Sequence, residues 1–509
     1  MTQTLPTPAD AVAWLRQRGA HALVCDSRRV RPGDALVAWP GAAQDGRRFV
    51  EAALAAGAVA CLVEHEGLDA WGFADPRIAA VPGLKAAAGP LAAAFHGAPS
   101  ADVRVVALTG TNGKTSTAWW TAQWLGALGA PAAVMGTLGI GVPGEAMDPT
   151  GLTTPDPVRL QSALRQLHGR GVRACVVEAS SIGLAEGRLN GTAVHTAVFT
   201  NFTQDHLDYH GSMADYWQAK RALFDWPGLR AAVVNLDDPQ GPGLARELAP
   251  RGLALWTVSV DGTPDADGAP ARLRVTERRW TTQGIAFTVE EAGGGRATLA
   301  LPVVGDYNLA NLLCALAVAR AQGHGLADAA AASAALTPVP GRMQSAWPDG
   351  PTELPLVLVD YAHTPDALDK ALQALQPVAR ERGGRLWCVV GCGGDRDRTK
   401  RPLMAAAAER EAARVVLTSD NPRSEDPLTI LHQMQAGLSE PVRAVVEPDR
   451  AQAIALAVRL ADARDVVLLA GKGHEDYQDV AGVQRPFSDL NEGRRALQAR
   501  HDATPGAAA

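Results

Sequence analysis

The stretch ALTGTNGKTST, residues 107–117, decides the fold class of this chain. It follows a short β-branched run that begins at Val103, and it leads into residues 114–129, where apolar side chains recur at helical spacing. The order is therefore strand, glycine-containing loop, helix. The common phosphate loop has a glycine five residues before the one that precedes the lysine, whereas Leu108 stands there in this chain. The shortened loop still predicts a site for nucleotide phosphates.

The residue types of this loop suit phosphate binding. Backbone N–H groups around Gly110 to Lys114, at the start of a helix, form a concave site for phosphate oxygens. Gly110 and Gly113 allow the tight backbone that such a loop needs. Lys114 can reach the β- and γ-phosphates, and the Thr115 hydroxyl is placed to ligate magnesium. A plain glycine turn before a helix is the simpler alternative, and the flanking strand and helix favour the phosphate site.

The composition indicates a globular protein of several domains. A chain of 509 residues exceeds what one hydrophobic core usually organises, so we expect two to four domains, at roughly one per 150 residues. Charged residues at 20% and hydrophobic residues at 47% are ordinary for such proteins. The net charge of -6 gives no overall attraction for nucleic acid or anionic lipid, which disfavours both as partners.

Other features favour a cytoplasmic protein. The six cysteines lie far apart or in apolar runs, as is typical of reduced thiols. The first 15 residues lack a basic start followed by a long apolar stretch, so we expect no secretory signal. No uninterrupted apolar span reaches membrane length, so we expect no membrane insertion.

Two boundaries divide the chain, one in the Pro-containing segment 95–103 and one in segment 336–344. Between them, strand-like runs such as 173–181 and 195–203 alternate with helical stretches, which predicts a parallel α/β sheet. Past the second boundary, four apolar runs each end in a loop rich in charged residues. Open α/β sheets bind ligands at the carboxyl ends of their strands, so these loops predict a second ligand site, although ordinary turns are the alternative.

Candidate metal ligands follow two strand-like runs. Magnesium on phosphates takes oxygen ligands, and Glu178, at the end of an apolar run, is a candidate for the second ligand beside Thr115. Lys220 follows on a predicted helix, where solvation would be its usual role. Segment 200–224 is dense in metal-capable groups, and this density suggests a metal site there; the groups are Asp205, His206, Asp208 and His210.

A series of motifs resembles the Mur ligases, which are ATP-dependent amide-forming enzymes of peptidoglycan synthesis. In order along the chain these motifs are GTNGKTS, EASS, NFTQDHLDYHG with the later Lys220, GDYNLANL, PGRMQ and VDYAHTPDAL. The shortened phosphate loop is the normal form in that family. Within the family, DSRRVRPGDALVA, GLTTPDP, GCGGDRDRTKRPLM, SDNPRSEDP and GKGHEDYQ resemble the members that make the UDP-N-acetylmuramoyl tripeptide.

The resemblance implies an α/β protein of three domains and a monomer. Residues 1–100 would bind the uridine-nucleotide sugar, residues 101–337 would form a P-loop-type parallel-sheet ATPase domain, and residues 338–509 would form a Rossmann-like domain for the amino acid. In the implied reaction, the terminal carboxylate of UDP-N-acetylmuramoyl-L-alanyl-D-glutamate attacks the γ-phosphate of ATP. The amine of meso-diaminopimelate then displaces phosphate from the acyl phosphate.

The resemblance also implies the residues that serve ATP and Mg²⁺. Thr115 and Glu178 would hold one ion, and His206 and a carbamylated Lys220 would serve the other, with Lys114, His206 and Lys220 as the catalytic residues. A lysine adds carbon dioxide only as the neutral amine, so its site must depress its pKa. Asp360 suits the ribose hydroxyls. The implied nucleotide contacts are Gly110, Thr111, Asn112, Gly113, Lys114, Thr115, Ser116, Asn308, Arg342 and Asp360.

Two further sets of residues carry over for the substrates. The implied contacts of the nucleotide sugar are Ser27, Ala42, Ala43, Gln44, Thr153, Thr154, Ser180 and Arg188. The implied contacts of the amino acid are Arg396, Asp420, Asn421, Pro422, Arg423, Gly471 and Glu475. Ile182 and Glu186 stand where these enzymes commonly have His and Gln, and both are left out of the predicted site.

Arg423 is the residue expected to choose the amino acid. A guanidinium donates two parallel hydrogen bonds to a carboxylate, so Arg423 would read the far carboxylate of diaminopimelate, and Glu475 would suit the distal ammonium. Lysine lacks that carboxylate, and a buried arginine left without its partner costs on the order of 1 to 3 kcal/mol or more.

Three alternatives stay open at this point. One is the same ligation with L-lysine, and another is folylpolyglutamate synthetase, which shares the ATPase domain but lacks the uridine-nucleotide domain. A third is a P-loop switch or motor protein, which would hydrolyse ATP regardless of both substrates. A GTPase is disfavoured because the chain shows no Asn-Lys-x-Asp motif.

Overall fold

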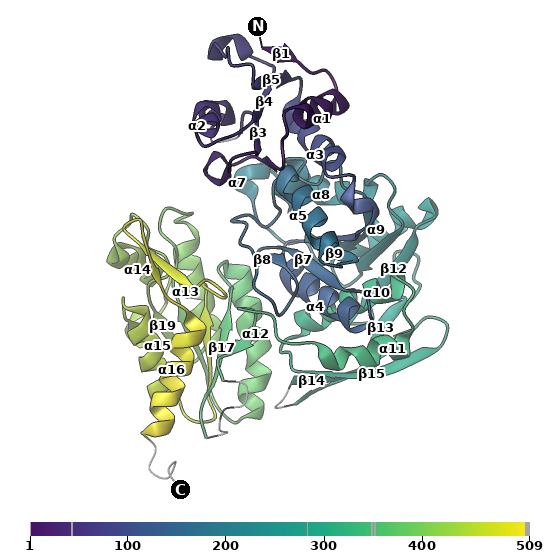
Figure 1. Cartoon of the computed structure of the whole chain (residues 1–509). Helices are drawn as coiled ribbons and strands as arrows, with labels where there is room; N and C mark the ends of the chain where they lie inside the picture. The colour runs from purple at the N-terminus through teal and green to yellow at the C-terminus, as the bar shows by residue number, and fades with distance from the viewer. Residues whose placement is uncertain (1, 42–43, 282–283, 348–349, 351–352, 504–509) are drawn as a thin grey trace. The chain divides into compact units, whose positions relative to one another are not determined.

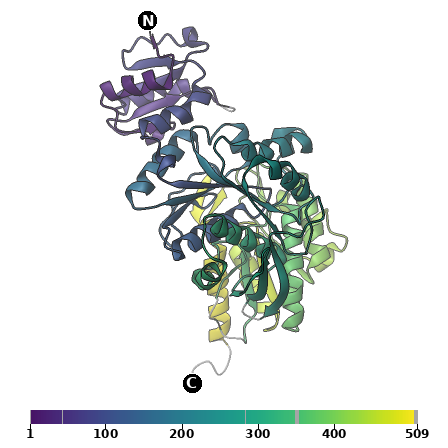
Figure 2. The same ribbon diagram turned by 90° about the vertical axis from the view of Figure 1, so that its right-hand side faces the viewer.

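The computed structural model describes residues 2–41, 44–281, 284–347, 350 and 353–503 (Figures 1 and 2). Ala42 and Ala43, two of the predicted nucleotide-sugar contacts, lie outside the described residues. The contacts divide the chain into two compact units. Unit 1 comprises Met1–Thr276, Val289–Ala297 and Ala310–Ala335, and unit 2 comprises Glu277–Thr288, Thr298–Leu309 and Leu336–Ala509.

The N-terminal part of unit 1 is a five-stranded sheet in the order β1-β5-β4-β3-β2, with every neighbouring pair parallel. Its strands are β1 Gln3–Thr4, β2 Leu23–Val24, β3 Ala35–Ala38, β4 Ala60–Glu64 and β5 Ile78–Val81. Its α-helices are α1 Pro8–Gln17, α2 Val50–Ala55 and α3 Leu84–Phe95. The strands β3, β4 and β5 are buried along their whole length, as expected for a sheet with helices on its faces.

The central sheet has the order β15-β14-β13-β12-β11-β10-β6-β9-β7-β8. Strand β6 pairs in parallel with β10 on one side and with β9 on the other, with Leu108 opposite Glu178 and Thr109 opposite Phe199. The carboxyl ends of these three strands therefore meet at one edge. The strands are β6 Arg104–Thr109, β7 Ala132–Gly136, β8 Gly139–Gly141, β9 Ala174–Glu178, β10 Val194–Phe199, β11 Ala231–Asn235, β12 Ala254–Ser259, β13 Leu273–Thr281, β14 Gly284–Glu291 and β15 Gly295–Leu301.

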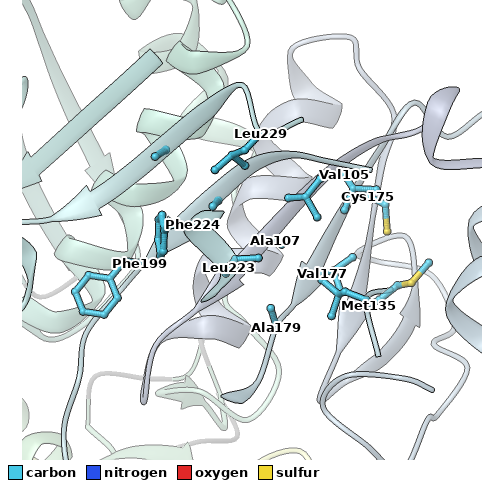
Figure 3. Close-up of a cluster of buried hydrophobic side chains, with 14 of the residues drawn as sticks. Val105, Ala107, Met135, Cys175, Val177, Ala179, Phe199, Leu223, Phe224 and Leu229 are labelled. Carbon is cyan, nitrogen blue, oxygen red and sulfur yellow. The ribbon is translucent and has the colours of Figure 1, made fainter. Parts of the chain in front are cut away.

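Local sequence sets where the helices of this part begin. The side chain of Asp156 accepts from the Arg159 N–H at the start of α5, and Ser212 accepts from the Asp215 N–H at the start of α8. The α-helices are α4 Lys114–Ala127, α5 Pro157–Gly169, α6 Ser181–Ala185, α7 Leu207–His210, α8 Met213–Arg221, α9 Gly241–Leu248, α10 Asp306–Ala321 and α11 Leu326–Ala332. Figure 3 shows part of the core beneath them, where Val105, Ala107 and Val177 lie among other fully buried side chains.

The main sheet of unit 2 has the order β16-β17-β21-β18-β19-β20, and all its pairs except β16 with β17 are parallel. Its strands are β16 Gln344–Ser345, β17 Leu356–Asp360, β18 Leu386–Val390, β19 Arg414–Leu417, β20 Val445–Val446 and β21 Val466–Ala470, and a separate hairpin pairs β22 Tyr477–Val480 with β23 Val483–Pro486. The α-helices are α12 Pro365–Glu381, α13 Lys400–Glu411, α14 Pro427–Gln435, α15 Arg450–Leu460 and α16 Asp489–Asp502.

The predicted α/β fold class is confirmed. The strand, loop and helix predicted around residues 107–117 are β6, the loop and α4, and the four apolar runs of the last part are β17, β18, β19 and β21. The domain limits at 100/101 and 337/338 stay a prediction. Among the described residues, no helix combines the length and the apolar character needed to cross a bilayer.

Candidate active site

Two glycines shape the phosphate loop between β6 and α4. Gly110 has φ +151°, and a Cβ there would lie 1.9 Å from Thr200 Oγ1. Gly113 has φ +82°, and a Cβ there would lie 2.2 Å from Asn311 Oδ1. Both positions therefore require glycine, for backbone conformation and for space.

The neighbouring strand end holds the loop in place. The N–H groups of Thr111 and Asn112 donate to the backbone oxygen and the Oδ1 of Asn201, each at 2.9 Å. The Thr200 hydroxyl donates to the Asn112 carbonyl at 2.7 Å. These two N–H groups therefore fix the shape of the loop. The predicted cradle for phosphate begins at Gly113, where α4 starts with Lys114, Thr115 and the buried Ser116.

The predicted catalytic lysines share one acceptor. Lys114 Nζ donates to the Gly110 carbonyl at 2.8 Å, and Lys220 Nζ donates to the same carbonyl at 2.7 Å. Burial lowers the pKa of Lys220 well below its usual value, and the positive charge of Lys114 lowers it further, while Asp205 opposes the shift. Lys220 is 1% exposed, and its ammonium lies 4.4 Å from the centre of the Tyr216 ring. The site thus favours a neutral amine, as a carbamate requires.

Glu178 lies at the end of β9 beside the phosphate loop, as predicted. Its Oε2 accepts from the Thr115 hydroxyl at 3.0 Å and from the Thr137 hydroxyl at 3.2 Å, and its Oε1 accepts from the Thr137 N–H at 3.0 Å. A Cβ at Gly136 would lie 2.0 Å from Glu178 Oε1, so the backbone of β7 approaches the carboxylate closely. One buried carboxylate with two hydroxyls is a hard-oxygen set that fits Mg²⁺.

Only some of the side chains in the histidine-rich segment 205–210 lie near one another. His206 has φ +50°, and its Nε2 lies 3.4 Å from Asp205 Oδ2. His210 shares a hydrogen bond of 3.0 Å with the Ser181 hydroxyl. Among the described residues, no three or more His, Cys, Asp or Glu side chains converge on a point where a metal could bind. Asp205, His206, Asp208 and His210 therefore do not converge on one point in the described part of the chain, and a metal site in this segment stays a prediction.

His206 and Lys220 instead meet a common neighbour. The rings of His206 and Tyr216 lie 6.1 Å apart, and the buried Tyr216 hydroxyl shares a hydrogen bond of 3.0 Å with the Thr111 hydroxyl. Tyr216 therefore links the phosphate loop to both residues of the predicted second metal site.

Three predicted contacts of the nucleotide sugar lie together. The Thr154 hydroxyl donates to the Glu178 carbonyl at 2.7 Å and shares a hydrogen bond of 2.9 Å with the Ser180 hydroxyl, and Arg188 Nη1 donates to the Thr154 carbonyl at 3.0 Å. The Thr153 hydroxyl lies 3.3 Å from that of Thr137. These residues thus adjoin Glu178.

Other predicted contacts of that substrate lie in the N-terminal part of unit 1. Ser27 is half-buried and begins a single 3-10 turn. The carbonyl of Gln44 accepts from the Gly41 N–H at 2.9 Å.

Unit 2 carries the other predicted nucleotide residues. The carboxylate of Asp360 accepts from the N–H groups of Met343 and Ala362 at 2.8 and 2.9 Å. Burial raises the pKa of Asp360, and Arg342 opposes this. The Arg342 guanidinium lies 4.6 Å from the centre of the Tyr361 ring, and the Asn308 amide donates to the Val304 carbonyl at 2.7 Å.

The predicted amino-acid residues lie in loops that follow β18, β19 and β21, three neighbouring parallel strands. The loops after β21 and β19 lie close together, because a Cβ at Gly471 would lie 2.7 Å from Asp420 Oδ2. The third loop, after β18, also lies against the loop after β19, because a Cβ at Gly394 would lie 1.9 Å from the Pro422 carbonyl. The exposed Arg396 lies in this third loop. The structure thus brings the predicted set to one edge of the sheet.

The hairpin of β22 and β23 fixes Arg423. The Arg423 N–H donates to the Asp479 carbonyl at 2.9 Å, and its carbonyl accepts from the Ala481 N–H at 2.7 Å. Arg423 has φ +51°, a backbone conformation that residues other than glycine rarely adopt. Its Nη1 donates to the Gly394 carbonyl at 2.7 Å. The orientation of this guanidinium is therefore set by the surrounding backbone.

Sequence reasoning missed Thr137 and Tyr216. Thr137 follows a short β7 run without a charged residue, and Tyr216 appears in the sequence as one apolar residue of a helix. Thr137 could have been found from its place at the end of β7, which pairs with β9. That inference requires the order of the strands in the sheet, which the sequence does not give.

Three domain families match successive parts of the chain. The family described as Mur ligase family, catalytic domain, matches residues 19–94. The Mur ligase middle domain matches residues 108–319, and the Mur ligase, glutamate ligase domain, matches residues 341–473.

Two curated relatives and a solved structure carry the same name. A UDP-N-acetylmuramoyl-L-alanyl-D-glutamate--2,6-diaminopimelate ligase of Acidovorax sp. (strain JS42) is 56% identical over 98% of both chains. The ligase of that name from Ralstonia nicotianae is 48% identical over 97% of this chain and 96% of its own. A solved structure with that name is 36% identical, covers 95% of each chain and has a TM-score of 0.65. A folylpolyglutamate synthase of Mycobacterium tuberculosis, 21% identical over 75% of this chain and 91% of its own with a TM-score of 0.57, shares the fold.

Proposed function

The chain belongs to the Mur ligase family, and on this basis we propose that it is an ATP-dependent ligase that adds meso-diaminopimelate to UDP-N-acetylmuramoyl-L-alanyl-D-glutamate. The product is the nucleotide-linked tripeptide of peptidoglycan synthesis. Residues 1–100 serve the nucleotide sugar, 101–337 serve ATP, and 338–509 serve the amino acid. We propose a cytoplasmic monomer.

The observation that carries this proposal is the placement of Arg423. Its backbone is held by the β22–β23 hairpin and its guanidinium reaches Gly394 O, within the cluster of loops at the ends of β18, β19 and β21. A guanidinium held in this way suits a second carboxylate on the amino acid. Diaminopimelate has that group, and lysine does not, so the geometry supports diaminopimelate over L-lysine.

The ATP side of the proposal rests on the loop before α4. Lys114 lies at the helix N-terminus and neutralises phosphate charge as the substrate carboxylate attacks the γ-phosphorus, the bond to the bridging oxygen breaks, and the acyl phosphate and ADP form. Thr115 and Glu178 would hold one Mg²⁺, which would supply further neutralisation of the phosphates when bound. Asn308, Arg342 and Asp360 hold the nucleotide, with Asp360 on the ribose.

Lys220 has a separate proposed role as a carbamate. Its low pKa gives a neutral amine, which attacks carbon dioxide, loses a proton and becomes an anionic oxygen donor. With His206 it would serve the second Mg²⁺. The reaction converts a neutral amine beside Lys114 into an anion, which attracts the Lys114 ammonium.

In the second half-reaction the amine of diaminopimelate displaces phosphate through a tetrahedral intermediate. Glu475 is suited to the distal ammonium, and Arg423 to the distal carboxylate, so both hold the far end of the amino acid. Thr153, Thr154, Ser180 and Arg188 hold the dipeptide end of the nucleotide sugar beside Glu178.

The test is a product assay with a panel of diamino acids. The enzyme receives ATP and UDP-N-acetylmuramoyl-L-alanyl-D-glutamate with meso-diaminopimelate, L-lysine or L-ornithine, and the product is identified by mass. We expect the diaminopimelate tripeptide. A lysine tripeptide as the main product would overturn the choice of amino acid, and ATP hydrolysis without any amide product would overturn ligation and favour a nucleotide switch.

A further inference from the structure

A buried lysine lies behind the proposed amino-acid site. Lys472 follows β21, and its side chain is 0% exposed. Its ammonium donates to Glu475 Oε2 at 2.9 Å and to Asn421 Oδ1 at 3.0 Å. The same ammonium lies 5.6 Å from the centre of the Tyr477 ring. A fully buried ammonium is costly unless its partners have good geometry, so these contacts hold it in one position.

Asn421 completes a closed set of hydrogen bonds. Its Nδ2 donates to Glu475 Oε2 at 2.8 Å, and its Oδ1 accepts from the Asp479 N–H at 2.9 Å as well as from Lys472. Because Nδ2 must donate and Oδ1 must accept, Lys472 and Asp479 together fix which way the amide faces. Asn421 is 2% exposed, so water does not compete for these bonds.

The two oxygens of Glu475 are used differently. Oε2 accepts from Lys472 and Asn421, whereas Oε1 accepts no hydrogen bond from the residues that the structure describes. The Glu475 side chain is 20% exposed, compared with 0% for Lys472. One oxygen of the carboxylate is therefore anchored, and the other is left for a ligand.

We propose that Lys472 is a positioning residue for diaminopimelate, which acts by fixing Glu475 so that its Oε1 faces the distal ammonium of the amino acid. The inference rests on the proposed function, because it assigns a role to a residue behind the same site. Lys472 does not touch the substrate. Lys472 holds the Glu475 carboxylate, which contacts the substrate, and through Asn421 it also holds the segment that leads to Arg423.

The test compares Lys472→Met with wild type in steady-state ligation. Methionine has a similar length but no charge or donor, so Glu475 is released. We expect KM for meso-diaminopimelate to rise about ten- to hundredfold, as for loss of one charged hydrogen bond. KM for ATP and for the nucleotide sugar should change less than about twofold. Equal increases in all three would indicate a general structural defect and overturn the proposal.

A double-variant cycle separates positioning from packing. In Glu475→Gln the carboxylate is gone, so adding Lys472→Met should raise KM for diaminopimelate less than about threefold further. Full additivity of the two effects would overturn the proposal. If thermal unfolding shows that Lys472→Met is not folded, Lys472→Gln takes its place, because its neutral amide group can still donate to Glu475 and should give a smaller rise in the same KM.

Wild type serves as the reference for the proposed function itself. Turnover of diaminopimelate by wild type with an unchanged KM in Lys472→Met would overturn only the role of Lys472. No turnover of diaminopimelate by wild type would overturn the proposed function, and the role of Lys472 with it. Lys370→Met is the matched control, because Lys370 is a half-exposed lysine on α12 paired with Asp366.

Discussion

Lys114 and Lys220 donate to one carbonyl oxygen, that of Gly110, at 2.8 and 2.7 Å. Burial lowers the pKa of Lys220 well below its usual value, and the positive charge of the neighbouring Lys114 lowers it further. The carbonyl sits in the phosphate loop itself. The state of Lys220 therefore bears directly on the charge that ATP meets there.

The first prediction concerns Lys220. We expect Lys220→Ala to lower kcat by about three orders of magnitude, because the proposed carbamate is lost. Added formate or acetate should restore part of the activity by supplying the missing carboxylate. Lys370→Ala is the control and should keep wild-type activity with no response to these acids. Full activity of Lys220→Ala would rule out the carbamate.

The second prediction concerns the close approach of β7 to Glu178. Gly136→Ala places a methyl group where the carboxylate now lies, so Glu178 must move away from Thr115. We expect kcat/KM to fall about a hundredfold and the magnesium concentration for half-maximal rate to rise. Gly126→Ala in α4 is the control, since a Cβ there meets nothing within 4 Å. Similar activities for the two variants would contradict the role of Glu178.

The third prediction concerns the choice of amino acid. Arg423→Lys removes the bidentate fork, so kcat/KM for diaminopimelate should fall about a hundredfold, and any slow reaction with L-lysine should fall much less. Both constants are measured in competition, by mass of the products. Arg485→Lys, an exposed position on the same hairpin, should leave both unchanged. Equal losses with the two amino acids would count against Arg423 as the selecting residue.

The fourth prediction concerns acid stability. Burial, and then the positive charge of Arg342, lower the pKa of His474 to about 4 from an ordinary 6.5. Below about pH 6.5 the unfolded chain binds a proton that the folded chain does not, so stability is lost as the pH falls from about 6.5 to about 4, by up to about 3 kcal/mol. Urea unfolding across this range should give a shallower loss for His474→Phe than for wild type. The exposed His432→Phe should keep the wild-type slope, and identical slopes for all three proteins would refute the assignment.

The fifth prediction concerns a fully buried ion pair in unit 2. Arg450 and Asp489 are both 0% exposed in their side chains, and Arg450 also donates to the carbonyls of Ser419 and Ala470 at 3.2 and 2.9 Å. Arg450→Met leaves the carboxylate unpaired, so we expect a loss of about 3 to 5 kcal/mol in urea unfolding. Arg495→Met breaks a pair in which the arginine side chain is 73% exposed, that of Arg495 with Glu492, and should cost at most about 1 kcal/mol. If Arg450→Met lost no more free energy of unfolding than Arg495→Met, the buried pair would not be needed for stability.

Sequence patterns could predict the elements that local rules determine. The phosphate loop, α4 and the position of Glu178 follow from a strand, two glycines and the adjacency of parallel strand ends. The arrangement of the acidic and histidine-rich segment could not be predicted, because spacing along the chain does not fix directions around a single turn such as α7. Thr137, Tyr216 and Lys472 were not predictable, since their contacts depend on strand order and on which side chains become buried.

Among the residues that the structure describes, the hairpin of β22 and β23 pairs with no strand of the main sheet, yet it sets the backbone of the residue proposed to select the amino acid. Changes in this ribbon would alter which building block enters the cell wall while leaving the phosphate loop of unit 1 as it is. The choice of amino acid and the binding of the phosphates are thus separable properties of the molecule, and a graft of this ribbon is a direct route to redesigning the peptide that cross-links the wall.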